Sequence, residues 1–226
     1  MRKNSRLVVR TLIVAGLALA LYLAPAAAQG EALIESFDDA GLPGWERPPD
    51  VTGLDGTLHV PPGGFAARFG SWADAALSIR VKVPADAQAV LVYSFRDAGH
   101  YRLSVFLQEL MLERVEGESA SLLAGAPITG LSADVWTEIK VTWSQGEHRV
   151  YLDGIEQLSA AEDAPLPPGG IMLRAEGGAP VEYDDLTLQP VAAPEAGPQV
   201  AATVTPTPVP TVVPSVGGLT DLLEQL

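Results

Sequence analysis

The chain contains no cysteine, and this absence removes several classes of protein from consideration. No disulfide, thiolate nucleophile or cysteine-ligated zinc site can be built without a thiol. The 226 residues, 47% of them hydrophobic, are still enough to bury one good core without covalent cross-links. We therefore expect one folded domain that is stabilised by packing alone.

Basic residues and asparagine are also scarce. Lys and Arg number 14 against 28 Asp and Glu, which gives a formal net charge of −14. Such a surface disfavours nucleic acid and anionic membrane surfaces as partners. Asn4 is the only asparagine, so no Asn-x-Ser/Thr glycosylation acceptor exists in the rest of the chain.

Residues 1–28 have the pattern of a signal peptide. Arg2, Lys3, Arg6 and Arg10 form a basic start, an apolar stretch of 13 residues follows at 12–24, and three alanines at 26–28 offer a cleavage site. The apolar stretch is short for a spanning helix, which needs about 20 residues. We expect export to the outside of the cell or its surface, with an uncleaved anchor as the alternative.

The segment 136–154 gives the clearest signal of secondary structure. Ile139, Val141 and Trp143 alternate with polar residues, and a Gln145-Gly146-Glu147 turn separates them from a second such run. One face is therefore buried and one is wet, as in an antiparallel sheet. Similar short runs occupy the body of the chain, residues 31–189, and no long helix is expected. The expected strands are 32–37, 57–60, 66–69, 75–83, 89–96, 101–107, 110–115, 121–124, 136–144, 148–152, 155–158, 170–175 and 181–188.

The end of the chain differs in composition from the body. Residues 190–218 contain seven prolines among Ala, Thr and Val, which is typical of a stiff, extended linker. In residues 219–226 the four leucines fall at i, i+3, i+4 and i+7, on one face of a two-turn helix. This short amphipathic segment is either a docking motif for a protein partner or a frayed tail, because two turns do not hold a helix in water.

A succession of short motifs runs through the body. They are Phe37-Asp38 with Gly44-Trp45, Gly56 to Val60, Ser94 to Asp97 with Tyr101 to Leu103, Trp136 to Gly154, and Val181 to Leu186. Their order resembles that of the concanavalin A-like lectin/glucanase jelly rolls, with the laminin-G-like and DUF1080-like (3-keto-disaccharide hydrolase-related) branch as the nearest in character. The resemblance implies an all-β fold, a two-sheet antiparallel jelly-roll sandwich, with sugar binding or hydrolysis as the recurrent activities.

The residues do not favour catalysis. Glycan-cleaving members of that superfamily carry a Glu-x-Asp-x-(x)-Glu strand, and this pattern is absent here. The acidic cluster of Glu109, Glu113, Glu116 and Glu118 has mixed parity, which is typical of a solvated strand edge. The histidines at 59, 100 and 148 stand alone and are interpreted as surface or turn residues rather than zinc ligands.

Four aspartates suggest a cation site. Asp38 and Asp39 lie near the start of the body, and Asp184 and Asp185 lie near its end, where sandwich folds commonly bring the first and last strands together. Calcium prefers such carboxylate and carbonyl oxygens, so Asp38, Asp184 and Asp185 are candidate Ca²⁺ ligands. The apolar alternation slips between Tyr183 and Leu186, which predicts a β-bulge at Asp184-Asp185. The alternative is that these acids cap turns or solvate an edge.

A second candidate site combines aromatic and guanidinium groups, which stack on and grip sugar rings. Its members are Trp72, Tyr93, Phe95, Arg96, Tyr101 and Arg102. The alternative is that the aromatic residues are core and that Arg96 pairs with an acid such as Asp97. The remaining tryptophans at 45, 136 and 143 are assigned to the core.

The sequence thus favours an exported, non-catalytic binding module for carbohydrate, with a glycan or cell-surface polysaccharide as partner. Two alternatives stay open. One is a glycoside hydrolase or lyase of the 3-keto-sugar type, and the other is a structural or adhesive module with no affinity for sugar.

Overall fold

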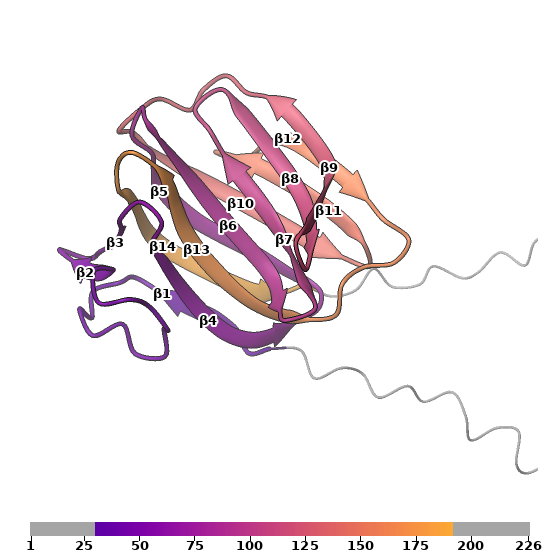
Figure 1. Ribbon diagram of the computed structural model, residues 1–226, viewed down its shortest axis with the longest axis horizontal. Helices are drawn as coiled ribbons and strands as arrows, with labels where there is room; N and C mark the ends of the chain where they lie inside the picture. The colour runs from indigo at the N-terminus through magenta and orange to yellow at the C-terminus, as the bar shows by residue number, and fades with distance from the viewer. Residues whose placement is uncertain (1–29, 192–226) are drawn as a thin grey trace, which may run out of the picture. The chain divides into compact units, whose positions relative to one another are not determined.

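The computed structural model describes residues 30–191, and in this part of the chain all regular structure is β-strand (Figure 1). The predicted signal peptide, the linker apart from residues 190 and 191, and the leucine segment lie outside the described residues. No helix capable of crossing a membrane occurs between residues 30 and 191. The strands are β1 (Leu33–Glu35), β2 (Thr52–Leu54), β3 (Thr57–Val60), β4 (Phe65–Trp72), β5 (Ala75–Lys82), β6 (Ala87–Arg96), β7 (Gly99–Val105), β8 (Glu109–Glu116), β9 (Ser119–Pro127), β10 (Trp136–Ser144), β11 (Glu147–Leu152), β12 (Ile155–Ala161), β13 (Gly169–Gly177) and β14 (Val181–Pro190).

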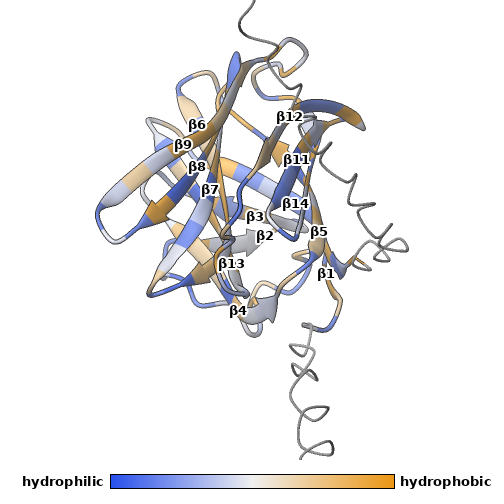
Figure 2. Cartoon of the chain, turned by 90° about the vertical axis from the view of Figure 1, so that its right-hand side faces the viewer, coloured by the Kyte–Doolittle hydropathy of each residue, from blue (hydrophilic) through white to orange (hydrophobic). Residues whose placement is uncertain are grey.

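Two antiparallel sheets form a sandwich, as the family resemblance implied. Sheet A has eight strands in the order β12-β11-β10-β5-β14-β3-β2, with β1 also paired to β14. Sheet B has six strands in the order β4-β13-β6-β7-β8-β9. Figure 2 shows the two sheets side by side, with β6 to β9, β13 and β4 in one layer and β5, β11, β12 and β14 in the other.

The alternation of residues explains why the strands pack as they do. In β5 every second residue is buried, so that Leu77, Ile79 and Val81 enter the core while the residues between them face outward. Sheet B supplies Leu91 and Leu103 from its central strands to the same core cluster. Side chains of the two inner faces therefore bury each other, which is the main stabilising contribution in a sandwich.

The hairpin of β10 and β11 confirms the strongest prediction and refines its turn. Gln145 and Gly146 both have positive φ, 49° and 84°, as a two-residue hairpin turn requires. Ser144 pairs with Glu147, so Glu147 belongs to β11 rather than to the turn.

The bulge predicted in the last strand is confirmed. The register between β14 and β5 shifts between Asp184 and Thr187, and Asp185 has a φ of 49°. The extra residue lets Tyr183 and Leu186 both face the core, where each has an exposure of 0%.

The assignment of the tryptophans to the core is correct at two positions and wrong at one. Trp45 and Trp143 are 8% and 3% exposed and belong to the core cluster. Trp136 is only partly buried and lies on the outer face of sheet A, where the Arg80 guanidinium lies 5.1 Å from the centre of its ring. Thr137 is buried, and adjacent residues of a strand face opposite sides of the sheet, so Trp136 faces outward.

Candidate functional site

A bulge in β6 places an aromatic residue on the outer face of sheet B. Leu91 and Tyr93 point inward with 0% exposure, so regular alternation would turn Phe95 inward too. Ser94 instead has a φ of 51°, and the register of β6 shifts at this point against both β7 and β13. Phe95 consequently faces outward, where its ring centre lies 5.9 Å from that of His100.

Phe95 is the middle of an aromatic strip that we define as Phe69, Phe95 and His100. The Phe69 side chain from β4 is 60% exposed, and its ring lies 6.0 Å from that of Phe95 in β6. The strand between them, β13, contributes Gly170, which pairs with Phe95. Gly170 lets β13 lie close to β4, since a Cβ atom there would lie only 2.5 Å from the Arg68 carbonyl oxygen.

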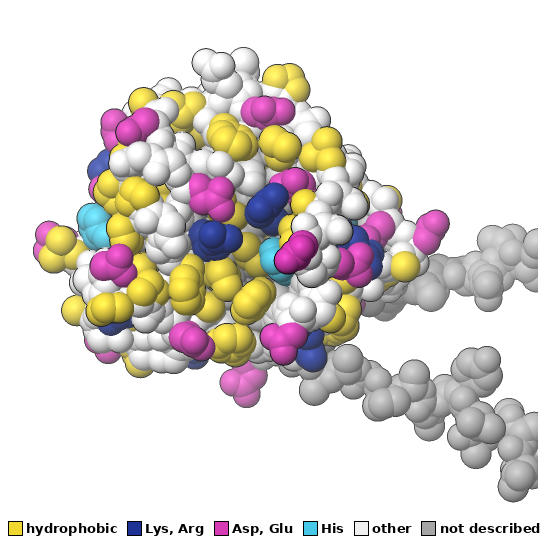
Figure 3. Space-filling model, viewed as in Figure 1, with side chains coloured by type: hydrophobic (Ala, Val, Ile, Leu, Met, Phe, Trp, Pro, Cys, Tyr) yellow, Lys and Arg dark blue, Asp and Glu magenta, His cyan; other side chains and the backbone are white. Residues whose placement is uncertain are grey.

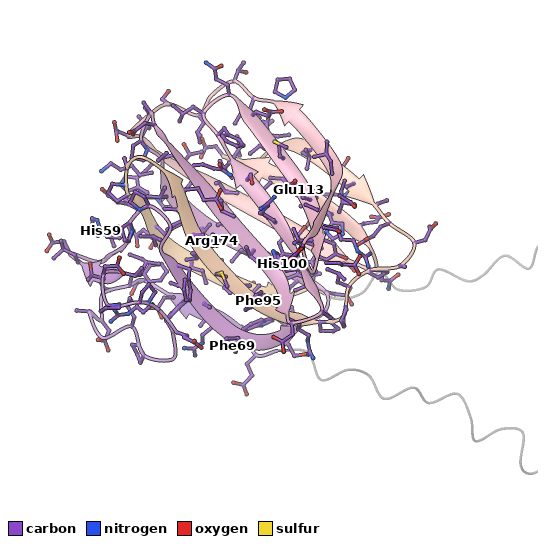
Figure 4. The ribbon with its side chains drawn as sticks, viewed as in Figure 1. His59, Phe69, Phe95, His100, Glu113 and Arg174 are labelled. Carbon is purple, nitrogen blue, oxygen red and sulfur yellow. The ribbon has the colours of Figure 1, made fainter. Side chains whose placement is uncertain are left out.

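The aromatic strip borders a hollow in the surface. This hollow has a volume of about 520 Å³ and is lined by Phe69, Gly70, Phe95, Arg96, Asp97 and Ala98. Figure 4 shows Phe69, Phe95, His100, Glu113 and Arg174 together on the face of sheet B that is turned to the viewer. An exposed aromatic surface beside a hollow is a common arrangement for ligand binding.

Two arginines extend the face beyond the aromatic strip. Arg102 lies 2.9 Å through Nε and 2.8 Å through Nη2 from the same carboxylate oxygen of Glu113. Arg174 has a looser partner in Glu176, at 3.5 Å. Val92 and Val90, which pair with Arg102 and Arg174, are 2% and 0% exposed although they lie outside the main core. Basic side chains are visible near the middle of this face in Figure 3.

The charges on this face affect the pKa of His100. Partial burial lowers the pKa of His100 below its usual 6.5, and the positive charges of Arg102 and Arg174 lower this pKa further. The imidazole is therefore neutral at pH 7, and it presents an aromatic face with one nitrogen donor and one acceptor.

Three of the six residues predicted for ligand binding lie on this face, and three do not. Phe95, Arg96 and Arg102 lie there, with Arg96 donating a hydrogen bond to the Pro168 carbonyl oxygen. The other three, Trp72, Tyr93 and Tyr101, are buried in the core at 5%, 0% and 1% exposure. The structure does not bring all six together, and the alternative that the aromatic residues are core holds for these three.

Sequence reasoning missed Phe69, His100, Arg174 and the role of Glu113. His100 could have been found from parity, because it precedes a buried residue of β7. Interpreting the acidic cluster as a strand edge was wrong, since β8 lies between β7 and β9. Glu113 pairs with Arg102 there because the two residues are directly opposite in the ladder.

No protein-family model matches the chain, and no curated protein matches it in sequence. Solved structures do match in fold. A Bacillus licheniformis β-glucanase aligns with a TM-score of 0.58 at 9% identity, over 72% of this chain and 99% of the other. The carbohydrate recognition domain of Emp47p aligns with a TM-score of 0.57 at 12% identity, over 74% and 99%. A prokaryotic β-1,3-1,4-glucanase (lichenase) derived from a mouse hindgut metagenome gives a TM-score of 0.57 at 14% identity, over 71% and 100%.

The chain shares the jelly-roll fold of these proteins. At these identities the likeness concerns the fold alone, and the site has to be argued from the side chains of this chain.

A cluster of polar side chains, separate from the aromatic strip, lies between the two sheets. Tyr93, His148, Glu162, Tyr101 and Arg114 are linked in it by hydrogen bonds, with Nε2 of His148 lying 3.3 Å from Glu162. The prediction that His148 is a surface or turn residue is wrong, because it is 1% exposed. Both its ring nitrogens are engaged, so this cluster is suited to holding the sheets together rather than to binding a ligand.

The predicted cation site lies at the bulge of β14. Arg80 Nη1 lies 3.2 Å from Asp185 and 3.9 Å from Asp184. Partial burial raises the pKa of Asp184, and the charges of Asp185 and Asp38 raise it too. Among residues 30–191 no group of three or more acidic, histidine or cysteine side chains has the arrangement of a metal site. Calcium binding by Asp38, Asp184 and Asp185 stays a prediction.

Proposed function

We propose that this protein is an exported, non-catalytic module that binds glycans through the aromatic strip on the outer face of sheet B. The observation that carries the proposal is the run of Phe69, Phe95 and His100 on this face, beside two arginines, with Phe69 and Phe95 lining a hollow. Flat aromatic rings supply the stacking surface that the apolar faces of sugar rings need, and guanidinium groups supply paired donors for their oxygens.

The acidic groups of the face support binding rather than hydrolysis. Glycosidic cleavage uses two carboxyl groups about 5 to 9.5 Å apart, one of which has to be available as an acid. Glu113 and Glu176 are each paired with an arginine, at 2.8 Å and 3.5 Å. Both carboxylates are therefore occupied by guanidinium groups and are not free to contact a glycosidic oxygen.

The fold neighbours agree with a role in carbohydrate recognition. One of them is named as a carbohydrate recognition domain, and others are named as glucanases. Because the latter are enzymes, the binding experiment has to include a measurement of turnover.

The test is a glycan array with the full chain, followed by calorimetry on any glycan that binds. Phe95→Ala and Phe69→Ala should each weaken binding about fivefold, since a stacked aromatic contributes about 1 kcal/mol. Tyr151→Ala is the matched control, because Tyr151 is a partly buried aromatic on β11, in the other sheet. Equal losses in all three variants, or the absence of any glycan ligand, would overturn the proposal. Release of sugar from a bound glycan would replace it with the hydrolase alternative.

Export is part of the same proposal and is tested separately. The mature protein recovered outside the cytoplasm should begin at Gln29, directly after the alanines at 26–28. Recovery of the intact leader in a membrane fraction would instead support an uncleaved anchor.

A further inference from the structure

The outer face of sheet B holds two arginines, Arg102 and Arg174, each beside a glutamate, in a chain that is strongly acidic overall. The formal net charge is −14, yet the charges that lower the pKa of the partly buried His100 on this face are those of Arg102 and Arg174. Charges more than about 8 Å apart are largely screened at physiological ionic strength. An anionic group that is seated on this face therefore interacts mainly with these arginines and their partners, and little with the distant acidic surface.

The two arginines differ in how firmly they are held. Two nitrogens of Arg102 lie 2.8 and 2.9 Å from one oxygen of Glu113, whose side chain is only 14% exposed. Arg174 has a single contact of 3.5 Å with Glu176, and both side chains are about one-third exposed. An exposed pair of this kind contributes little to stability, so Arg174 can exchange its partner at small cost.

The position and shape of the Arg174 side chain suit a contact with a new anion. Its cross-strand neighbour Val90 is fully buried, so the arginine stem covers an apolar patch and not a solvated one. The planar guanidinium can bind a carboxylate through two parallel hydrogen bonds.

The spacing of the groups sets a minimum length for the ligand. Gly170 pairs with Phe95, and Arg174 is four residues further along the same strand. At about 3.3 Å per residue this separation is about 13 Å along β13. One sugar ring does not span it, so a ligand that uses both Phe95 and Arg174 has more than one ring.

We infer that the face selects anionic oligosaccharides, with an aromatic contact to one sugar at Phe95 and an acidic group of a neighbouring sugar bound by Arg174. The inference rests on the proposed function and adds the chemical class of the ligand. Uronic acid carboxylates and sugar sulfates share the required chemistry.

The experiment compares ligands that differ in charge alone. The full chain is titrated with oligomers of galacturonic, glucuronic and mannuronic acid and with the methyl ester of each, and with dextran sulfate and dextran. At least one acidic form should bind tenfold or more tightly than its neutral counterpart, and this preference should fall as salt rises. The two series show whether carboxylate or sulfate is the source of the charge.

Variants locate the preference on the surface. Arg174→Gln should abolish the preference for the acidic form while leaving the melting temperature unchanged, because the Arg174–Glu176 pair is partly exposed. Arg149→Gln is the matched control, because Arg149 in sheet A also has acidic partners at 3.5 and 3.7 Å. A preference that survives in Arg174→Gln, or equal binding of charged and neutral forms, overturns the inference. If the neutral forms bind as tightly as the acidic forms and Phe95→Ala weakens this binding, the proposed function stands and only the preference for anionic glycans is wrong. If no glycan binds, both are wrong.

Discussion

The hydroxyl group of Tyr93 lies 2.9 Å from Nδ1 of His148, and this hydrogen bond joins β6 of sheet B to β11 of sheet A. On its other side His148 contacts Glu162, which in turn accepts hydrogen bonds from Tyr101 and Arg114. The cluster therefore draws on four strands and the segment that follows β12. Its buried polar groups are satisfied by one another, as a stable interior requires.

This cluster predicts how stability depends on pH. Burial lowers the pKa of His148 below 6.5, more than Glu162 raises it, and the pKa of His100 is lowered as well. The unfolded chain therefore takes up more protons than the folded protein as pH falls. The free energy of unfolding should be highest above about pH 6.5 and should fall on acidification through the folded pKa values.

Denaturant titrations between pH 8 and pH 5 check this dependence. His148→Leu should flatten it, and at pH 8 it should lower the free energy of unfolding by about 1 to 3 kcal/mol, because the Tyr93 hydroxyl loses its partner. His59→Gln, in β3, is the control and should keep the wild-type slope. A slope that is the same in all three proteins would contradict the assignment to His148.

Glu162 should be the more important of the two partners of Arg114. Arg114 lies 2.6 Å from Glu162, which is 10% exposed, and 3.0 Å from Glu116, which is 55% exposed. Glu162→Gln leaves Arg114, Tyr101 and His148 with a weaker hydrogen-bond acceptor. The substitution should lower the free energy of unfolding, measured by thermal denaturation, by about 2 kcal/mol. Glu116→Gln should have no measurable effect, because an exposed pair is screened by water. Equal effects of the two substitutions would show that the burial of Glu162 does not matter.

Most strands were predictable because apolar residues alternate with polar ones along much of their length. β3 and β10 have the predicted bounds. The other eleven predicted strands, including the one that corresponds to the short β1, each overlap an observed strand and differ from it by a few residues at the ends. β2, Thr52–Leu54, was missed because three residues with one buried glycine give no alternation to detect. The pairing of strands into two sheets depends on contacts far apart in sequence, and it came from the family resemblance and not from the residues.

The candidate site was predicted only in part, and the reason is local. Tyr93 and Phe95 are two residues apart, which places them on the same side of a regular strand. The bulge at Ser94 separates them, and serine carries no sequence signal for a positive φ of 51°. Asp184-Asp185 could be predicted as a bulge because the apolar pattern itself slips there. At Ser94 both neighbours are aromatic, so no slip is visible.

The bulge at Ser94 predicts the outcome of two substitutions at one position. Serine is strained at this φ, and glycine adopts it freely. Ser94→Gly should be neutral or stabilising and should retain glycan affinity. Ser94→Val should lower the free energy of unfolding by about 1 to 2 kcal/mol, because a β-branched residue resists a left-handed conformation. It should also weaken glycan binding by displacing Phe95. Wild-type affinity in a folded Ser94→Val protein would show that the bulge does not position the ring.

The aspartates at the bulge of β14 allow calcium binding to be tested with little ambiguity. Without calcium, Asp184→Asn should be at least as stable as wild type at pH 7, because the raised pKa of Asp184 means that folding disfavours its charge. If the site holds the ion, millimolar Ca²⁺ should raise the melting temperature of wild type, and Asp184→Asn should lose this rise. Asp39→Asn is the matched control, since Asp39 is a neighbouring acid that caps the Gly41 amide and should keep the response. A melting temperature of wild type that does not change between EDTA and Ca²⁺ would exclude the predicted site.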